Sequence, residues 1–551
     1  MHAEIPVKEV RVTPAAGRGI PNSPEISNTP TTPATLDLPD NADVVVLGAG
    51  HNGLVCASYL AAAGLEVVVL EAQNVVGGNT ATEELTLPGF AHDSCSSAHV
   101  LIQSNPLLRD DELGLLSTYG LEYIFSDPAV VLPQPDGDSL VMHRDLESTA
   151  DEISRWSKAD AEAFRTLLSE WSGGLAAMHG RWSSGLPLGD DDAARAYLSL
   201  REQSAWDVVH QRFSNPTVRS FMLWLSLATI QDPRRTGTGV LPSSISAGRI
   251  RFGWSTPVGG SSALPHALIR QLEAHGGRVV CSAPVSRIDV VGGRAVAVKT
   301  TDGRRVAARR AVVSSAHAAQ LADLLHGVQT PSDVAEMRDS WRPGLSVFAV
   351  HAALRKDLAF HSDNGPVESV AGGLGSVEGI AGQMEAFQRG EPDASDPWLL
   401  VVNQTVVDKS RVPGAGATFK ILTVAPYERA DGRGWDESKD EYADALVDLV
   451  RARTDGLDPA DILALRAESP VDIAARNPHN LGGSCHGGEF LTASGVVIPG
   501  WPTHRSSIEG LFLTGATTHP GGSVSGRPGR NAARVILSDL GLDSSKVMGG
   551  S

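Results

Sequence analysis

Cysteine is scarce in this chain, and long apolar runs are missing. The 551 residues include four cysteines, Cys56, Cys95, Cys281 and Cys485, and no two of them form a Cys-x-x-Cys pair. The sequence therefore excludes a redox dithiol of that kind, and the scattered thiols favour a reducing compartment, so we expect a cytoplasmic protein. No apolar run approaches the ~20 residues of a membrane-spanning helix, and the first forty residues contain no apolar signal-peptide core.

Positive charge is also in deficit. Lysine and arginine number 46 against 64 aspartates and glutamates, which gives a net charge of −18. This balance argues against a nucleic-acid partner and favours an acidic enzyme with a small-molecule substrate. Aromatic residues make up only 5% of the chain. No metal-ligand spacing and no Ser-His-Asp arrangement is evident, so we expect no metal.

A glycine-rich turn between two apolar strands is the strongest feature that is present. Residues 43–47 predict a strand, a Gly-x-Gly-x-x-Gly turn follows, and residues 54–63 predict a helix. Residues 65–70 predict a second strand, which ends in Glu71. A strand, turn, helix and strand with an acid about twenty residues past the glycines are typical of a dinucleotide-binding βαβ unit.

Each residue of this pattern has a physical role. Gly48 makes the tight turn, Gly50 lets the backbone approach a pyrophosphate, and Gly53 lets the helix pack closely on the strand. The free N–H groups and the dipole at the helix start favour the phosphates. The carboxylate of Glu71 accepts the hydrogens of a ribose diol.

A second glycine pair follows six residues after the acid. Gly77 and Gly78, with Asn79 next to them, supply another place of close backbone approach. An NAD dehydrogenase has no need of one there, whereas a larger dinucleotide whose second half continues across the protein does. The alternative is an ordinary turn after the strand, because Gly-Gly is common in loops.

The C-terminal part contains a related arrangement. Residues 511–513 predict a strand and residues 529–540 a helix. The connection between them reads Thr514-Gly515-Ala516-Thr517-Thr518-His519-Pro520-Gly521-Gly522-Ser523-Val524-Ser525-Gly526. The start of this helix can face an electron-rich group, such as the N1–C2=O edge of a flavin.

With both glycine-rich ends, the chain resembles the carotenoid and phytoene desaturases and their bacterial relatives, the phytoene-dehydrogenase-related proteins. These belong to a superfamily that also contains amine oxidases and Rab GDP-dissociation inhibitors. The resemblance is anchored at residues 43–99, 254–316 and 480–540. It implies FAD as cofactor and an α/β fold, in which a Rossmann-like FAD-binding domain is interleaved with a substrate domain of mixed sheet and covering helices.

The resemblance also implies which residues contact FAD. They are Gly48, Gly50 and Gly53 at the pyrophosphate, Glu71 at the ribose, Gly78 and Asn79 toward the flavin, Val285 at the adenine, and Gly515, His519, Pro520, Gly522 and Val524 around the isoalloxazine and ribityl. Ser523 is a departure, because many relatives have a third glycine there. A serine at this position crowds the flavin or donates a hydrogen bond to it.

The expected domain order follows from the position of these motifs. It is a flexible tail over 1–40, FAD-binding parts over 41–145, 246–330 and 476–551, a helical substrate cap over 146–245, and a substrate domain over 331–475. Two other glycine clusters, at 373–379 and 414–416, are predicted to be loops, because neither follows a clear strand and opens a helix with an acid downstream. We therefore expect no second nicotinamide site.

The predicted reaction is the dehydrogenation of an apolar or amphiphilic small molecule by hydride transfer to flavin N5. His99 and His519 are the candidate catalytic bases, because both lie in segments that flank the flavin in the resembled family. Two alternatives stay open: an oxidase of C–N bonds, which would use an aromatic pair over the flavin, and a non-catalytic binding protein similar to the GDP-dissociation inhibitors. A peripheral membrane contact and an oligomer are both compatible with the sequence.

Overall fold

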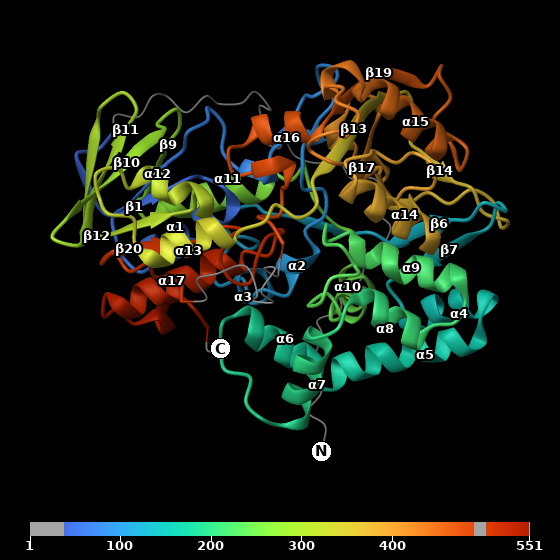
Figure 1. Cartoon of the computed structure of the whole chain (residues 1–551), viewed down its shortest axis with the longest axis horizontal. Coiled ribbons are helices and arrows are strands. Elements are labelled where there is room, and N and C mark those ends of the chain that lie inside the picture. The colour runs from blue at the N-terminus through green and yellow to red at the C-terminus, as the bar shows by residue number, and fades with distance from the viewer. Residues whose placement is uncertain (1–37, 490–502, 550–551) are drawn as a thin grey trace, which may run out of the picture.

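Two β-sheets, each covered by helices, form the two halves of the molecule (Figure 1). The structure is a computed structural model and describes residues 38–489 and 503–549. The tail expected over residues 1–40 therefore lies, through residue 37, outside the described residues. Helices combined with mixed sheets confirm the predicted α/β class.

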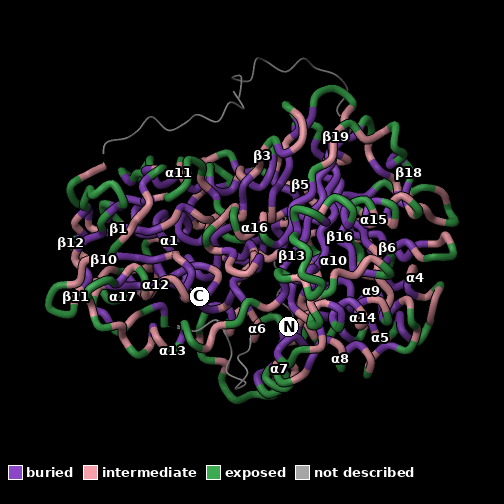
Figure 2. The backbone as a smooth tube through the Cα atoms, turned by 45° about the horizontal axis from the view of Figure 1, so that its top comes forward, coloured by how far each residue is buried: buried purple, intermediate pink, exposed green. Residues whose placement is uncertain are grey.

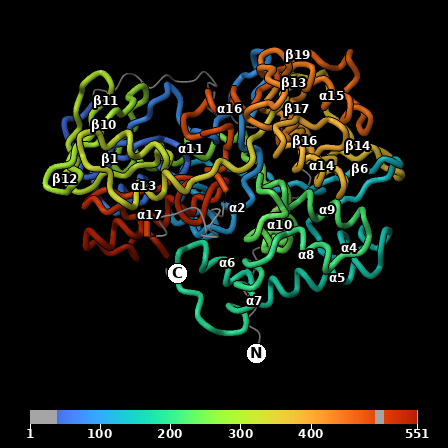
Figure 3. Tube along the Cα trace, in the orientation of Figure 1, coloured from blue at the N-terminus to red at the C-terminus, as the bar shows by residue number. Residues whose placement is uncertain are grey.

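The first sheet is built around the predicted βαβ unit. In order across the sheet its strands are β10 (Val285–Val291), β11 (Arg294–Thr300), β12 (Arg305–Ser314), β1 (Asn41–Leu47), β2 (Val67–Leu70) and β9 (Arg278–Val280), and β20 (Leu511–Leu513) pairs with β12. The pairings among β20, β12, β1, β2 and β9 are parallel, whereas β10 and β11 extend the sheet in antiparallel fashion. The parallel core comes from three distant parts of the chain, which appear as blue, yellow-green and red traces in one half of Figure 3.

Helices cover both faces of this sheet. They are α1 (His51–Ala62), α11 (Ala263–Ala274) and α17 (Arg527–Asp539) on one face, and α12 (Leu321–Leu324) and α13 (Ser332–Ser340) on the other. Val44 and Val46 of β1 pack with the first group, and Val45 and Leu47 with the second. Burial on both faces explains why β1 is continuously apolar.

The second sheet is almost entirely antiparallel. Its strands, in order, are β19 (Ile462–Glu468), β13 (Val347–Leu354), β17 (Ala417–Val424), β16 (Leu399–Val402), β15 (Ala371–Leu374), β6 (Val130–Pro133) and β7 (Ser139–Met142). Helix α15 (Lys439–Arg451) covers one face, where Tyr442 and Leu446 pack on Phe348. Figure 2 shows the strands of both halves as largely buried trace.

A run of helices covers the opposite face of the second sheet. They are α4 (Leu146–Trp156), α5 (Lys158–Glu170), α8 (Ala205–Arg212), α9 (Pro216–Leu227) and α10 (Leu241–Phe252). Helices α6 (Ala176–Ser183) and α7 (Asp192–Arg201) pack on each other in a separate cluster beside this layer. Trp224 of α9 ties this layer to the sheet, because its indole N–H donates to the Leu399 carbonyl at 2.8 Å. The indole of Trp398 in turn donates to the Trp224 carbonyl at 3.1 Å.

The structure corrects one prediction about a glycine cluster. Residues 373–379 do follow a strand and open a helix: β15 ends at Leu374, and α14 (Val377–Gln388) begins after Ser376, whose hydroxyl accepts from the Gly379 N–H at 2.9 Å. A Cβ at Gly373 would lie 2.2 Å from the indole nitrogen of Trp224. This glycine therefore serves close packing with α9. The second cluster, at 414–416, is a loop as predicted.

Two general features of the chain bear on its environment. All four cysteines are free thiols. Within residues 38–489 and 503–549, no helix is both long enough and apolar enough to cross a bilayer. The compartment stays a prediction.

Candidate functional site

A cavity of about 1020 Å³ is walled by both halves of the molecule. This volume is at the upper end of the ~300–1,000 Å³ usual for ligand sites. The glycine-rich turns of the first sheet form one part of the wall, while Leu400 and Leu422 of the second sheet, together with Ile245 of α10, form another. One space therefore joins a nucleotide-type wall to an apolar wall.

The turn between β1 and α1 shows why it needs three glycines. Gly48 has a φ of +92°, and a Cβ there would lie 2.4 Å from the Ser315 hydroxyl oxygen. A Cβ at Gly53 would lie 2.2 Å from the Gly48 carbonyl oxygen. A Cβ at Gly50, by contrast, would meet nothing within 4 Å. Gly48 and Gly53 thus allow tight packing, and Gly50 leaves the backbone open to the cavity beside the free N–H groups that begin α1.

Glu71 lies at the end of β2, on the cavity wall. One carboxylate oxygen accepts from the Ala49 N–H at 2.7 Å, and the other accepts from the Gln73 N–H at 2.9 Å. Burial raises the pKa of Glu71, and these backbone donors oppose that rise. The carboxylate therefore fixes the turn, and each oxygen keeps a lone pair for a further donor.

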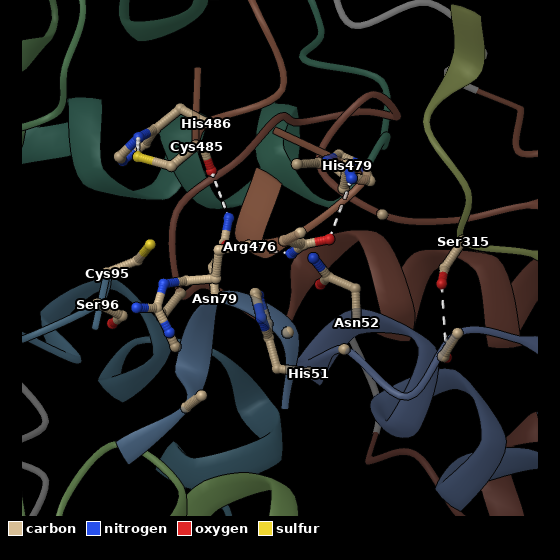
Figure 4. Close-up of a pocket in the computed structure, with 18 of the residues that line it drawn as sticks. His51, Asn52, Asn79, Cys95, Ser96, Ser315, Arg476, His479, Cys485 and His486 are labelled. Atoms are coloured by element: carbon tan, nitrogen blue, oxygen red, sulfur yellow. Dashed lines mark hydrogen bonds between the residues drawn. The ribbon is translucent and has the colours of Figure 1, made fainter. Parts of the chain in front are cut away.

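The second glycine pair lies directly against the first turn. The Gly77 N–H donates to the Ala49 carbonyl at 2.9 Å, and a Cβ at Gly78 would lie 3.4 Å from the Cα of Gly50. The side-chain amide of Asn79 donates to the Cys485 carbonyl at 3.0 Å (Figure 4). Asn79 thereby holds the chain segment near residue 485 against the cavity.

The C-terminal connection reaches the same cavity. Gly515, Ser523 and Val524 line it, and so does Val285 at the start of β10. Ser523 has a φ of +76°, a conformation that favours glycine. The backbone at this position therefore has the conformation that suits the glycine expected from the resemblance.

Most of the residues predicted to contact FAD thus lie on one wall. Those that line the cavity are Gly48, Gly50, Gly53, Glu71, Gly78, Asn79, Val285, Gly515 and Val524. His519, Pro520 and Gly522 do not line it. A Cβ at Gly522 would lie 2.2 Å from the His486 carbonyl oxygen, so this glycine lets the C-terminal connection pack on the segment that Asn79 holds.

The two candidate bases are both buried. His99 is fully buried, with Nδ1 3.0 Å from the Tyr123 hydroxyl and Nε2 3.2 Å from the Ser261 hydroxyl. Nε2 of His519 lies 2.5 Å from the Trp182 carbonyl oxygen. Neither histidine is among the described residues that line the cavity. Their partners give both a structural role, and a catalytic one stays a prediction.

Other histidines line the cavity, and the sequence favoured none of them as a base. They are His51, His317, His479 and His486, and Figure 4 labels all of them except His317. Burial lowers the pKa of His51, His479 and His486 to about 4, so these rings are neutral at pH 7. For His51 the sequence did contain a signal. His51 directly follows Gly50 in the glycine-rich turn and is the first residue of α1.

Several buried polar atoms here fit a bound dinucleotide. Among the described residues, Nε2 of His51, Nε2 of His479 and Oδ1 of Asn52 have no hydrogen-bond partner, and all three side chains line the cavity. Buried polar groups are rarely left unpaired in folded proteins. The hydroxyls and phosphates of a dinucleotide would supply the missing partners.

These features define a flavin-dependent oxidoreductase of the dinucleotide-binding type. They are two glycine-rich strand-to-helix turns, an acid at the end of a strand, and unpaired polar atoms on one large cavity. The chain belongs to the family described as flavin containing amine oxidoreductase, whose sequence model matches residues 53–537. FAD is its cofactor, and the predicted superfamily is confirmed. Family membership supports the enzymatic interpretation over a non-catalytic binding protein.

Relatives and solved structures agree with this assignment. The chain is 28% identical to one of the subunits of limonene dehydrogenase from Castellaniella defragrans, with 91% of this chain and 95% of that protein covered. It is 24% identical to a lycopene-forming phytoene desaturase of a Paracoccus species, with 90% and 97% covered. Putrescine oxidase bound to putrescine shares the fold at a TM-score of 0.61 and 16% identity, covering 91% of this chain and 99% of that one.

Proposed function

We propose that this enzyme dehydrogenates an apolar or amphiphilic small molecule and forms a carbon–carbon double bond. The observation that carries the proposal is the single cavity that joins the FAD wall to an apolar wall. The apolar side chains on that wall include Leu101, Ile230, Ile245, Leu400 and Leu422. Two of the relatives are named as a dehydrogenase and a desaturase, which supports the same reaction class.

In such a reaction the protein mainly binds the cofactor and the substrate and orients them toward each other. Bound FAD supplies the hydride acceptor, flavin N5. Gly50 and the start of α1 would hold the pyrophosphate, Glu71 the ribose, and Gly515 and Val524 the flavin end. The apolar wall would hold the substrate against the flavin and exclude water from it.

The second hydrogen leaves the substrate as a proton, and a neutral histidine can accept it. His99 and His519 remain the candidates from the sequence. His51, His479 and His486 are additional candidates, because they are neutral and lie on the cavity wall. Each histidine can be replaced with alanine in FAD-loaded protein. Loss of a base should lower the rate while FAD stays bound, whereas loss of a residue that holds the cofactor should release FAD.

Oxidation of a C–N bond is the second candidate function. The fold shared with putrescine oxidase favours it. The carboxylates on the cavity wall add nothing to this, because Glu83 and Glu468 pair with Arg476 and Asp472 pairs with Lys439. Against it, Trp254 is the single Trp, Tyr or Phe among the described residues that line the cavity. An aromatic pair over the flavin is therefore not found in the described part of the wall.

Anaerobic reduction of the purified protein distinguishes the two functions. The flavin absorbance is followed while a panel of terpenes, polyenes, fatty acids and primary or secondary amines is added without oxygen. Bleaching by an alkene precursor, with the matching double bond detected in the product, supports the proposal. Bleaching by amines alone would replace it with C–N oxidation.

A further inference from the structure

Arg249 is a buried cation on the substrate part of the cavity wall. It lies in the last turn of α10, is 6% exposed and lines the cavity one helical turn after Ile245. Its guanidinium carbon lies 3.9 Å from the ring centre of Trp254, which also lines the cavity. The guanidinium donates from Nη1 to the Gly253 carbonyl at 3.3 Å.

No carboxylate in the described part of the chain neutralises this charge. Among the described residues, no Asp or Glu forms an ion pair with Arg249, and its Nε has no hydrogen-bond partner. Burial lowers the pKa of Arg249 to about 9, with no opposing contribution from an acid. At pH 7 the side chain is still protonated, so the cavity contains an uncompensated positive charge.

Arg411 provides a contrast, because its buried charge is neutralised by carboxylates of the chain itself. Arg411 is 1% exposed, and its guanidinium pairs with Asp93 at 2.9 Å and with Asp408 at 3.0 Å. An unpaired buried charge is costly unless a partner arrives from outside the chain. Arg249 faces a cavity, so a ligand can be that partner.

The position of Arg249 separates it from the expected phosphate site. The pyrophosphate of FAD is expected at residues 48–53, on the first sheet. Helix α10 instead packs on α9 and α2 (Val100–Gln103), and a Cβ at Gly248 would lie 3.0 Å from a Val100 methyl group. On the cavity wall Arg249 lies beside Trp254 and one helical turn from Ile245.

We propose that Arg249 binds an anionic head group, such as a carboxylate, on a substrate whose apolar body lies along the same wall. This inference rests on the proposed function and narrows its substrate class to amphiphilic oxyanions. A planar guanidinium suits bidentate binding of a carboxylate. Burial away from water strengthens that interaction relative to an exposed pair.

Binding of dodecanoate and dodecanol to the FAD-loaded enzyme tests the proposal. Isothermal titration calorimetry gives the two affinities, and the flavin difference spectrum reports entry into the cavity. Wild type should bind dodecanoate about 10- to 100-fold more tightly than dodecanol, since a hydrogen bond to a charged group has this effect. Arg249→Gln should remove that preference and leave the dodecanol affinity unchanged, and Arg249→Lys should restore part of it.

Arg251→Gln is the matched control. Arg251 lies two residues further along the chain, is exposed and is not among the described residues that line the cavity. It should behave as wild type. FAD content and thermal melting are measured for every variant, to show that Arg249→Gln is folded and loaded.

Three results would overturn the inference. They are equal binding of dodecanoate and dodecanol by wild type, no binding of either, and loss of FAD from Arg249→Gln, which would make Arg249 a cofactor ligand. A different result would reject the proposed function, namely that no alkene precursor reduces the flavin. An enzyme that bleaches with neutral terpenes while Arg249→Gln changes nothing would keep the function and reject the head-group site.

Discussion

Asp93 connects the ion-pair network of the core to the wall of the cavity. Its carboxylate accepts from Arg411 at 2.9 Å and from Gln404 at 2.8 Å. The ammonium of Lys420 is also buried and donates to the carbonyls of residues 93, 94 and 95, the last at 2.7 Å. Because Cys95 lines the cavity, these buried charges hold the backbone of the wall in place. Their cost is offset by nearly complete hydrogen bonding.

Replacing Asp93 should destabilise the protein in a pH-dependent way. Burial favours a raised pKa for Asp93, but Arg411 and the hydrogen bonds from Thr82, Ser261 and Gln404 outweigh it and lower the pKa to about 2. The ionised form therefore stabilises the fold above the unfolded pKa near 3.8, and this contribution is lost as the pH falls toward 2. Asp93→Asn should lower the free energy of unfolding by about 3–5 kcal/mol at pH 7.

Denaturant unfolding at pH 7 and at decreasing pH measures this effect. The difference between wild type and Asp93→Asn should narrow below about pH 4, because Asp93 then becomes protonated in the unfolded chain while it stays ionised in the folded protein until the pH approaches 2. Glu391→Gln is the control, since Glu391 pairs with Arg389 on the surface and should unfold as wild type. A difference that is constant with pH would show that the charge of Asp93 is not what stabilises the wall.

Glu71→Ala should weaken FAD retention. The Ala49 and Gln73 N–H groups would lose their acceptor, and a bound ribose would lose its partner, at a cost of about 1–3 kcal/mol in binding. Titration of apoprotein with FAD measures the change in Kd. Glu66→Ala is a matched control, because Glu66 pairs with Arg309 at the surface. An unchanged Kd for Glu71→Ala would remove this residue from the site.

At the scale of elements, the C-terminal connection is clamped between two distant segments. His519 joins it to α6 through the Trp182 carbonyl, with the two rings 4.7 Å apart and edge to face. Gly522 packs on the backbone of His486. The flavin end of the cavity therefore depends on contacts from the helical layer as well as on its own glycines.

His519→Ala tests whether this histidine is structural or catalytic. We expect FAD affinity and flavin reduction rate to fall together, because the clamp to α6 is lost. Retained FAD with a rate reduced about 10²–10⁴-fold would instead identify a base. Rapid-mixing measurements of flavin reduction, with FAD content determined in parallel, separate the two. His326→Ala, at an exposed position, should match wild type.

Local patterns in the sequence predicted the nucleotide-binding elements well. Residues whose roles depend on contacts with distant parts of the chain could not be predicted in this way. Gly48, Gly53 and Glu71 could be predicted because each acts within one βαβ unit. The partner of His519 could not, since Trp182 lies 337 residues earlier in the chain. Arg249 was not predicted either, because only the packing of α10 shows that it faces a cavity. The prediction of a loop at 373–379 was wrong, because Gly373 belongs to β15 and packs against Trp224 of α9.

At the scale of the whole molecule, one sheet is assembled from three separated segments. Val45 of β1 pairs with Val312 of β12, which in turn pairs with Leu511 of β20. A Cβ at Gly529 of α17 would lie 2.4 Å from the Asn52 carbonyl oxygen in α1, so both ends of the described chain meet at the FAD site. The second half of the molecule lies between these segments in sequence and supplies the opposite wall of the cavity.

The assembled molecule should not accept electrons rapidly from NADPH or NADH. The glycine-rich turns that line the cavity, at residues 48–53, 77–78 and 515–524, all belong to one dinucleotide site. Of the two other glycine clusters, residues 373–379 pack on α9, and residues 414–416 form a loop before β17. We therefore expect the flavin to be reduced by substrate only, with reoxidation by dioxygen, a quinone or a protein carrier.

Anaerobic mixing with NADPH should leave the flavin absorbance unchanged on the timescale of substrate turnover. Rapid stoichiometric bleaching would reveal a nicotinamide site, and Gly414→Val would then show whether the loop at 414–416 forms it.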